Sequence, residues 1–286
     1  MAHFLVANDY ISGGSRSSSR NGGSPIHMRS LLNSQLNDIY DQTLNPTNQP
    51  LSLQFFSASS QKIKQLTQTV IDNHYEQGCP PDSHAYIFGG YCDLTVKKTI
   101  PLYRLKNQNV HYEEVVFDHT IPSAYGHLVA EIVKSARFLR GEGIRPCFAT
   151  IPPASLKEWN NFRLSNGKTA LLLHEGQYDD MQGRLNTVLS SVNSFICKLN
   201  YWNNMYTPYI AGTVLRTKAK RSDNFILQWH KFYDGVHADD TLIEEWATKF
   251  SRAIRKNRVA FRSAHQHASA SLSIPLTDEW IHSFTS

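Results

Sequence analysis

Short apolar runs alternate with amphipathic segments along this chain of 286 residues, and this alternation constrains the fold more than any other feature. A run of about 4–8 apolar residues is typical of a buried strand, whereas apolar residues at every third or fourth position are typical of a helix. Strands that alternate with helices form βαβ units, so we expect a mostly parallel sheet. The five predicted strands are His3–Ala7, Leu51–Ser57, Ala85–Phe88, Pro146–Ile151 and Tyr209–Leu215.

Four segments have helical spacing, and the last is predicted to begin at Thr241 because Glu244 completes the spacing of a capping box. The predicted fold class is therefore α/β, a three-layer α/β/α sandwich with a mostly parallel, five-stranded sheet of the flavodoxin-like kind. Such sheets bind ligands outside the carboxyl ends of their strands. The apolar helical positions are Met28, Leu31, Leu32, Leu36, Ile39 and Tyr40; Ile63, Leu66, Val70 and Ile71; Leu185, Val188, Leu189, Val192, Phe195, Ile196, Leu199 and Trp202; and Leu242, Ile243, Trp246, Phe250 and Ile254.

Three segments interrupt this alternation. Residues 12–25 are rich in Ser and Gly and are predicted to be a flexible loop. Residues 99–118 are predicted to be an inserted β-hairpin with its turn at residues 106–109. Residues 259–286 are predicted to be an extended C-terminal tail, which leaves residues 1–258 as one domain. The tail carries apolar groups that predict docking or self-assembly, namely Leu272, Ile274, Leu276, Trp280, Ile281 and Phe284.

Composition and cysteine spacing exclude several classes of protein. With 41% hydrophobic and 19% charged residues, the chain is neither disordered throughout nor collagen-like nor a coiled coil. Its four cysteines form no CxxC pair, which argues against a zinc knuckle or a dense disulfide framework. No run approaches the roughly 18 apolar residues of a membrane span, and no basic leader is evident. We expect an intracellular protein, in the cytoplasm, the nucleus or a virus particle, without membrane contact.

No cofactor is expected from the motifs. The Ser/Gly-rich loop contains neither GxxxxGKS/T nor GxGxxG, so the phosphate-loop and dinucleotide hypotheses fail, although Arg16 and Arg20 could hold an anion. The histidines at positions 111, 119 and 127, and the pair at 265 and 267, lack carboxylate or cysteine partners at metal-site spacing. Scattered surface histidines are therefore favoured over a zinc site.

Positive charge is concentrated in residues 216–262. This segment has eleven basic and six acidic residues, and so carries the whole net charge of +5. One hypothesis is a basic face that binds nucleic acid. The alternative is a solvated or protein-contacting face, because cations near a helix C-terminus are favoured without any ligand. The candidate nucleic-acid-binding residues are Arg216, Lys218, Lys220, Arg221, Arg252, Arg255 and Arg258.

Polar residues follow the predicted strands and precede the last helix. Asp234 lies three residues before His237, a spacing that lets a carboxylate orient a histidine as a general base. By itself this spacing is equally explained by a turn aspartate followed by a half-buried loop histidine. The other strand ends are Asn8-Asp9-Tyr10, Ser57-Ala58-Ser59 and Gly89-Gly90-Tyr91-Cys92-Asp93.

Taken together, these segments resemble the SGNH (GDSL) hydrolase superfamily over about residues 2–258. Four blocks carry the resemblance: LVANDYISGG, FFSASSQKIKQLT, YIFGGYCDLT and FYDGVHADDTLIEEWATKF. The chain is also similar to SGNH-like domains of animal mobile elements and viruses. The resemblance implies an α/β sandwich with a serine nucleophile, glycine and asparagine oxyanion donors, and a DxxH pair before the final helix.

The motifs depart from the family at the reacting positions. The resemblance places Tyr10 or Asp9 at the nucleophile position. It places Ala58 or Ser57 at the glycine oxyanion position, and Cys92, after Gly90 of the same block, at the asparagine oxyanion position. The residues that match are Gly90, Asp93, Asp234 and His237, the last two as a vestigial catalytic pair.

Loss of the nucleophile predicts a pseudoenzyme. We expect a catalytically degenerate protein with a structural or interaction role, encoded by a virus or mobile element. One alternative is an esterase or acyl hydrolase with a relocated nucleophile, for which Ser12, Ser15 and Cys92 are candidates. Another is phosphoryl or DNA-strand chemistry on Tyr10 or Asp9, and a third is a nucleic-acid-binding module.

Overall fold

The computed structural model describes residues 2–8, 28–36, 51–57, 61–76, 78, 83–101, 111–118, 123–166, 175–217 and 225–266. The predicted loop at residues 12–25, the hairpin turn at residues 106–109 and residues 267–286 of the predicted tail lie outside these ranges.

A parallel sheet forms the centre of the molecule. Its strands β1 (Ala2–Asn8), β2 (Leu51–Ser57), β3 (His84–Phe88) and β6 (Arg145–Phe148) lie in the order β2-β1-β3-β6. The register pairs Phe4 of β1 with Leu53 and His84 of its neighbours. The chain moves outward from β1 in both directions, so the order reverses between β1 and β3, where ligands bind in open α/β sheets.

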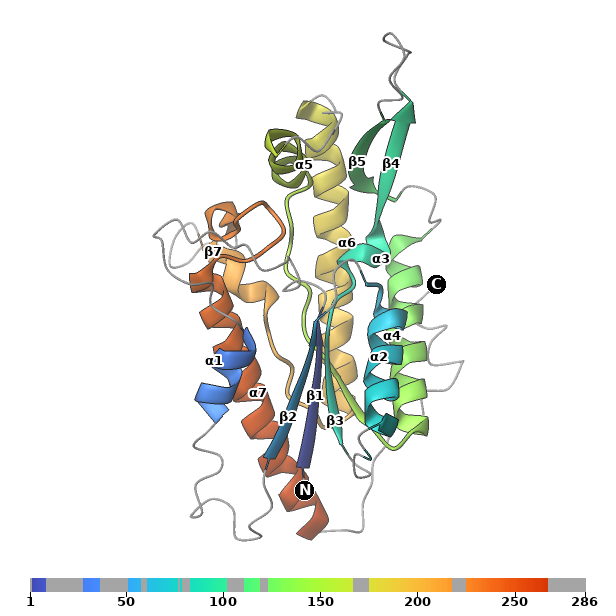
Figure 1. The fold of residues 1–286 in the computed structure, drawn as a ribbon, viewed down its shortest axis with the longest axis vertical. Coiled ribbons are helices and arrows are strands. Elements are labelled where there is room, and N and C mark those ends of the chain that lie inside the picture. The colour runs from blue at the N-terminus through green and yellow to red at the C-terminus, as the bar shows by residue number, and fades with distance from the viewer. Residues whose placement is uncertain are drawn as a thin grey trace.

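Helices cover both faces of the sheet, which confirms the predicted α/β class and its layers. One layer holds α1 (Met28–Leu36) and α7 (Asp240–Gln266), and the other holds α2 (Ile63–Glu76), α4 (Ala124–Gly141) and α6 (Glu175–Trp202) (Figure 1). The predicted helices are present, but α4 and α5 (Leu156–Ser165) were not predicted from the spacing.

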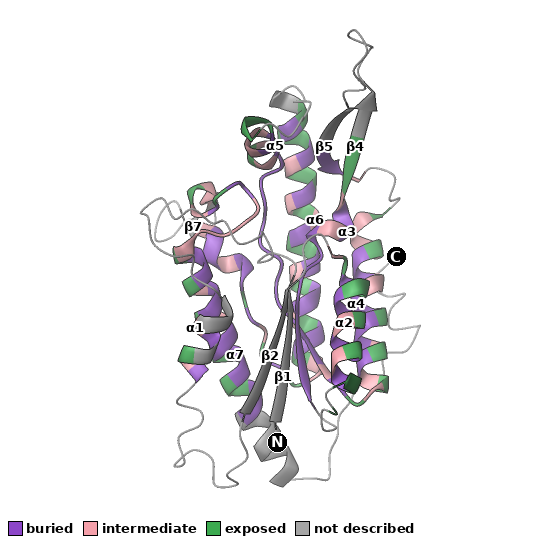
Figure 2. Cartoon of the chain, in the orientation of Figure 1, coloured by how far each residue is buried: buried purple, intermediate pink, exposed green. Residues whose placement is uncertain are grey.

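The core is centred on β3, whose five residues are all buried (Figure 2). Tyr86 and Phe88 face α7, where the Phe88 ring lies 5.1 Å from Trp246 and 5.8 Å from Phe250, centroid to centroid. The buried Trp246 indole donates through Nε1 to Thr213 Oγ1 at 2.9 Å. A strand buried on both faces explains the unbroken apolar run in the sequence.

The prediction of a fifth strand at Tyr209–Leu215 is wrong. Within the described residues the parallel sheet has four strands, and Ala211–Val214 forms a turn of 3₁₀ helix, η2. Beyond it, β7 (Leu215–Thr217) pairs antiparallel with β8 (Phe225–Leu227) instead of joining the main sheet.

Side chains of α6 occupy the edge of β6 that a fifth strand would have used. Asn200 Nδ2 donates to the carbonyl oxygen of Phe148 at 2.7 Å, and its Oδ1 accepts from the Phe148 N–H at 3.1 Å. Asn193 makes the same pair of bonds with Ile151, at 2.8 and 2.6 Å. Pro208 accepts from the Thr150 N–H at 3.1 Å but has no N–H to return. The backbone groups at this edge are therefore satisfied without a strand ladder.

The predicted hairpin is confirmed, although it begins earlier than expected. The strand β4 (Thr95–Pro101) starts directly after the short helix α3 (Tyr91–Leu94) and pairs antiparallel with β5 (His111–Phe117). Asn160 of α5 exchanges hydrogen bonds with both backbone groups of Val115, at 2.8 and 3.0 Å. The hairpin is thus fastened to the body through β5.

The last helix differs from its prediction at both ends. Asp239 caps α7, because its Oδ1 accepts from the Leu242 N–H at 2.8 Å, so the predicted start at Thr241 is wrong. At the other end, α7 continues to Gln266, and residues 259–266 are helical where an extended tail was expected. The division into domain and tail otherwise stays a prediction. No helix in the described ranges is long and apolar enough to cross a membrane.

Candidate functional site

Asp234 and His237 form a hydrogen-bonded pair in the turn before α7. His237 donates from Nδ1 to Asp234 Oδ2 at 2.6 Å. The other carboxylate oxygen, Oδ1, accepts from the backbone N–H groups of Val236 at 3.0 Å and His237 at 2.7 Å. The Asp234 side chain is 3% exposed and the His237 side chain 27% exposed. A buried carboxylate thus orients a partly accessible imidazole, the arrangement that a general base requires.

The turn is held against the start of α5 by Gly235. Its carbonyl accepts from the Ser155 N–H at 2.8 Å, and its φ of +92° is in the left-handed region that favours glycine. A Cβ at this position would lie 2.6 Å from Glu158 Cβ and 2.9 Å from the Ser155 carbonyl oxygen. Both conformation and space therefore require glycine between Asp234 and His237.

An aromatic row extends from His237 along α5. Trp159 meets the imidazole edge to face at 5.3 Å and stacks on Phe162, whose ring lies 5.1 Å from Tyr233. Sequence reasoning missed this wall because it did not predict α5. The signal that would have found the helix is the capping spacing Ser155 to Glu158, where the Ser155 hydroxyl accepts from the Glu158 N–H.

The glycine after β3 has a backbone conformation that favours glycine. Gly90 has a φ of +119°, and a Cβ there would lie 2.6 Å from Ile151 Cδ1 and 3.3 Å from Ile63 Cδ1. Cys92, at the predicted oxyanion position, is half-buried in α3.

Asp93 serves the fold in this structure. Its Oδ2 accepts from the Ile63 N–H at 3.0 Å and so caps the start of α2. Burial is the main cause that raises the pKa of its carboxyl from 3.8 to about 6, against the smaller lowering effect of that hydrogen bond. The matching aspartate of the motif thus joins α3 to α2.

The segment that follows β6 connects the two motif regions. Ile151 packs on Gly90, while Ser155 bonds to Gly235. Figure 1 places α3, α5 and the start of α7 beyond the carboxyl end of the strands, as the α/β class predicts. The structure therefore brings Gly90 and the Asp234–His237 pair to the same end of the sheet.

Several predicted site residues lie outside the described residues. These are Asp9, Tyr10 and Ala58, together with Lys218, Lys220 and Arg221 of the basic set. Of Arg216 only the backbone is described, and Arg258 is buried at 8% exposure, whereas Arg252 and Arg255 are exposed on α7. In the described part of the chain, no three His, Cys, Asp or Glu side chains are grouped to hold a metal ion.

Comparison with known proteins gives likenesses of fold. No protein-family model matches the chain, and no curated protein matches it. Among solved structures, the chain is similar to a lipase/acylhydrolase from Enterococcus faecalis (12% identity, 90% of this chain and 97% of that one, TM-score 0.47). It is also similar to a putative lipolytic protein of the G-D-S-L family from Desulfitobacterium hafniense (10% identity, 88% of this chain and 99% of that one, TM-score 0.49). A third similar structure is an acetyl xylan esterase from Geobacillus stearothermophilus (14% identity, 90% of this chain and 94% of that one, TM-score 0.45).

Proposed function

We propose that this chain is a catalytically degenerate, SGNH-like protein that serves as an interaction protein. The observation that carries the proposal is the contrast between a fully built Asp234–His237 pair and the residues at the positions that would act on a substrate. The motif places Tyr10 or Asp9 where the nucleophile would stand, and Cys92 where an oxyanion donor would stand. An oriented base without a nucleophile has no hydroxyl to activate.

The size of the expected loss supports this proposal. Removing a triad nucleophile costs about six orders of magnitude in kcat, and removing one oxyanion donor from an intact site costs about two to three. Without the nucleophile, an intact oxyanion hole still gives about 10³- to 10⁴-fold over the uncatalysed rate, and loss of an oxyanion donor removes most of that remainder.

Hydrolysis of 4-nitrophenyl acetate tests the catalytic half of the proposal. We expect no turnover above a heat-denatured control, and no difference between the wild type and His237→Ala. The matched control is His230→Ala, which removes an exposed histidine from the neighbouring turn η3 (Trp229–Lys231). Turnover that His237→Ala abolishes and His230→Ala leaves intact would overturn the proposal.

The hairpin supports the interaction half. It projects beyond the helical layers (Figure 1), and among the described strands β4 pairs with β5 alone. Val96 of β4 is 42% exposed, whereas Val115, Val116 and Phe117 of β5 are buried. A projecting strand with an apolar side chain in water is a surface on which a second chain can dock.

Assembly can be measured by light scattering after size-exclusion chromatography over a range of concentrations. We expect oligomers that Val96→Glu weakens, and that Trp280→Ser with Phe284→Ser in the predicted tail also weakens. Phe138→Glu is the matched control, because Phe138 is similarly exposed, at 47%, on α4. A monomer at every concentration, or equal effects of Val96→Glu and Phe138→Glu, would count against assembly through the hairpin.

An ester hydrolase with a relocated nucleophile is the second candidate. It is favoured by the His237 geometry, in which Asp234 occupies Nδ1 and the aromatic wall of Trp159 lines one side of the ring. It predicts turnover that depends on His237 and that is lost in one of Ser12→Ala, Ser15→Ala or Cys92→Ala. If all three variants retain full turnover, the nucleophile is none of these residues and this candidate fails. Origin in a virus or mobile element stays a prediction from the resemblance.

A further inference from the structure

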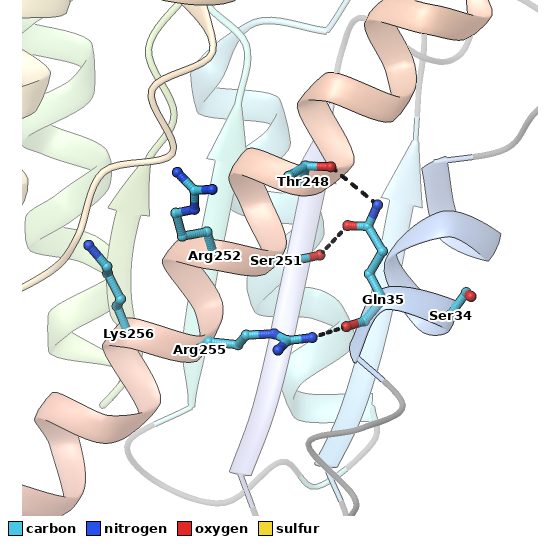
Figure 3. Close-up of a pocket in the computed structure, with 7 residues that line it drawn as sticks. All are labelled: Ser34, Gln35, Thr248, Ser251, Arg252, Arg255 and Lys256. Atoms are coloured by element: carbon cyan, nitrogen blue, oxygen red, sulfur yellow. Dashed lines mark hydrogen bonds between the residues drawn. The ribbon is translucent and has the colours of Figure 1, made fainter.

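We propose that the basic surface of α7 formed by Arg252 and Lys256, which borders the groove between α1 and α7 and is continued by Tyr206, binds single-stranded nucleic acid. The groove has a volume of about 680 Å³ and lies on the helical layer opposite α2, α4 and α6 (Figures 1 and 3). This binding would be independent of any ester hydrolysis at His237. Its lining residues are Ser34, Gln35, Thr248, Ser251, Arg252, Arg255 and Lys256.

The lining carries three cations and no carboxylate. Arg252 and Lys256 are one helical turn apart, and like charges at this spacing destabilise a helix. Both side chains are exposed, and neither forms an ion pair with any residue that the structure describes. Moreover, the chain has no acidic residue from Lys249 to Arg262. Uncompensated charge of one sign is what binding of an anion requires.

The helix dipole does not account for these cations. The dipole favours positive charge only in the last turn of a helix. Because α7 runs to Gln266, Arg252 and Lys256 lie more than two turns before its end. The extension of α7 beyond the predicted boundary at residue 258 therefore removes the main alternative explanation for the charge.

Neutral side chains fix the geometry of the groove. Gln35 of α1 donates to Thr248 Oγ1 at 3.3 Å and accepts from Ser251 Oγ at 2.7 Å, and its carbonyl accepts from Arg255. Arg252 and Lys256 extend from the side of α7 that faces away from Gln35 (Figure 3). Thus α1 is held on α7, and these two cations remain available to a ligand.

A fixed aromatic ring adjoins the cations. The Lys256 ammonium lies 4.8 Å from the centroid of the Tyr206 ring, and Tyr206 is 48% exposed. Asn257 of α7 accepts from the Tyr206 N–H at 2.5 Å and donates to its carbonyl at 3.3 Å, so the backbone that carries the ring is anchored.

Cations beside an exposed ring favour a single strand over other anions. A single strand offers phosphates to the cations and unstacked bases to the ring. A duplex offers phosphates to the cations but keeps its bases stacked, so it gains nothing from the ring. In addition, α7 is packed against both β3 and α1 and so cannot enter a major groove. An acidic polypeptide would use the cations but gain nothing from the ring.

The test is fluorescence anisotropy with a labelled oligothymidylate of about 16 nucleotides, the upper end of known site sizes. With two phosphate contacts, from Arg252 and Lys256, the slope of log K against log salt should be about −1.4, so affinity falls about 7-fold from 50 to 200 mM salt. Arg252→Gln with Lys256→Gln should bring the slope close to zero, so that the affinity that remains hardly changes over this range of salt. The matched control is Lys64→Gln with Lys198→Gln, which removes two exposed charges from α2 and α6.

Substitutions of Tyr206 test base stacking separately from charge, because they change the ring and leave the net charge unchanged. Tyr206→Ala should weaken binding about 5- to 140-fold, from the worth of one stacked base, while Tyr206→Phe should bind like the wild type. Circular dichroism checks that each variant is folded. The proposal is overturned by absent binding, by an equal effect of the two double variants, by duplex DNA binding as tightly, or by equal competition from polyglutamate with no effect of Tyr206→Ala.

Discussion

Replacing Asn200 tests whether side-chain amides close the edge of the sheet. Asn200 is fully buried and satisfies both backbone groups of Phe148, itself 2% exposed. In Asn200→Ala, the Phe148 N–H and C=O lose their partners in a region with no access to solvent. In Asn200→Leu the same bonds are lost while the branched side chain keeps its number of heavy atoms and leaves no cavity, so the two variants separate hydrogen bonding from cavity formation.

The expected cost follows from the two orphaned groups. A buried backbone group left without a partner costs about 1–3 kcal/mol, so the free energy of unfolding should fall by about 2–6 kcal/mol. Asn200→Ala adds a cavity cost to this, whereas Asn200→Leu does not. Because domains are stable by only about 5–15 kcal/mol, this loss is a large share of the total.

Equilibrium unfolding in urea, followed by tryptophan fluorescence and circular dichroism, measures the change. The control is Asn203→Ala, because Asn203, directly after α6, is half-buried and makes weaker contacts: its Nδ2 donates to the Leu199 carbonyl, and its Oδ1 accepts from Arg140 Nη1 at 3.4 Å. That variant should stay within about 1 kcal/mol of the wild type. Both Asn200 variants within about 0.5 kcal/mol of the wild type would refute the idea that these amides replace a strand.

Two further predictions concern the motif residues. Because burial raises the pKa of Asp93 to about 6, its contribution to stability is present below about pH 4 and is lost as pH rises through about 6. Between pH 4 and pH 7, the free energy of unfolding of Asp93→Asn in urea should therefore rise by up to about 3 kcal/mol relative to that of the wild type. The control Asp72→Asn, at an exposed position, should show no such rise, and a pH-independent difference for Asp93→Asn would contradict the prediction. In thermal unfolding, Gly235→Ala should lower the free energy of unfolding by more than about 2 kcal/mol, because the new Cβ meets Glu158. Gly78→Ala, at a φ of +58° with open space around it, should lower the free energy of unfolding by about 1 kcal/mol. Equal costs for the two glycines would show that the close contact is unimportant.

Local spacing was enough to predict much of this protein. Of the five strands that the apolar runs predicted, four form the parallel sheet of the α/β class, and the alternation around residues 106–109 predicted the hairpin. The pairing of Asp234 with His237 was also predictable, because partners three residues apart in one turn meet whatever the rest of the chain does. In each case the determining interaction lies within a few residues or follows from a regular period.

Tertiary structure alone decided what closes the sheet and what surrounds the site. In the sequence, Asn200 is a polar residue that interrupts the apolar face of a helix. In the structure it bonds to Phe148, 52 residues earlier in the chain, and so takes the place of a fifth strand. Trp159 reaches His237 only because Gly235 fixes the turn on α5. The basic residues became a groove only when α1 docked on α7 through Gln35. These contacts join residues that no period relates, so they are set by the packing of whole elements and not by local sequence.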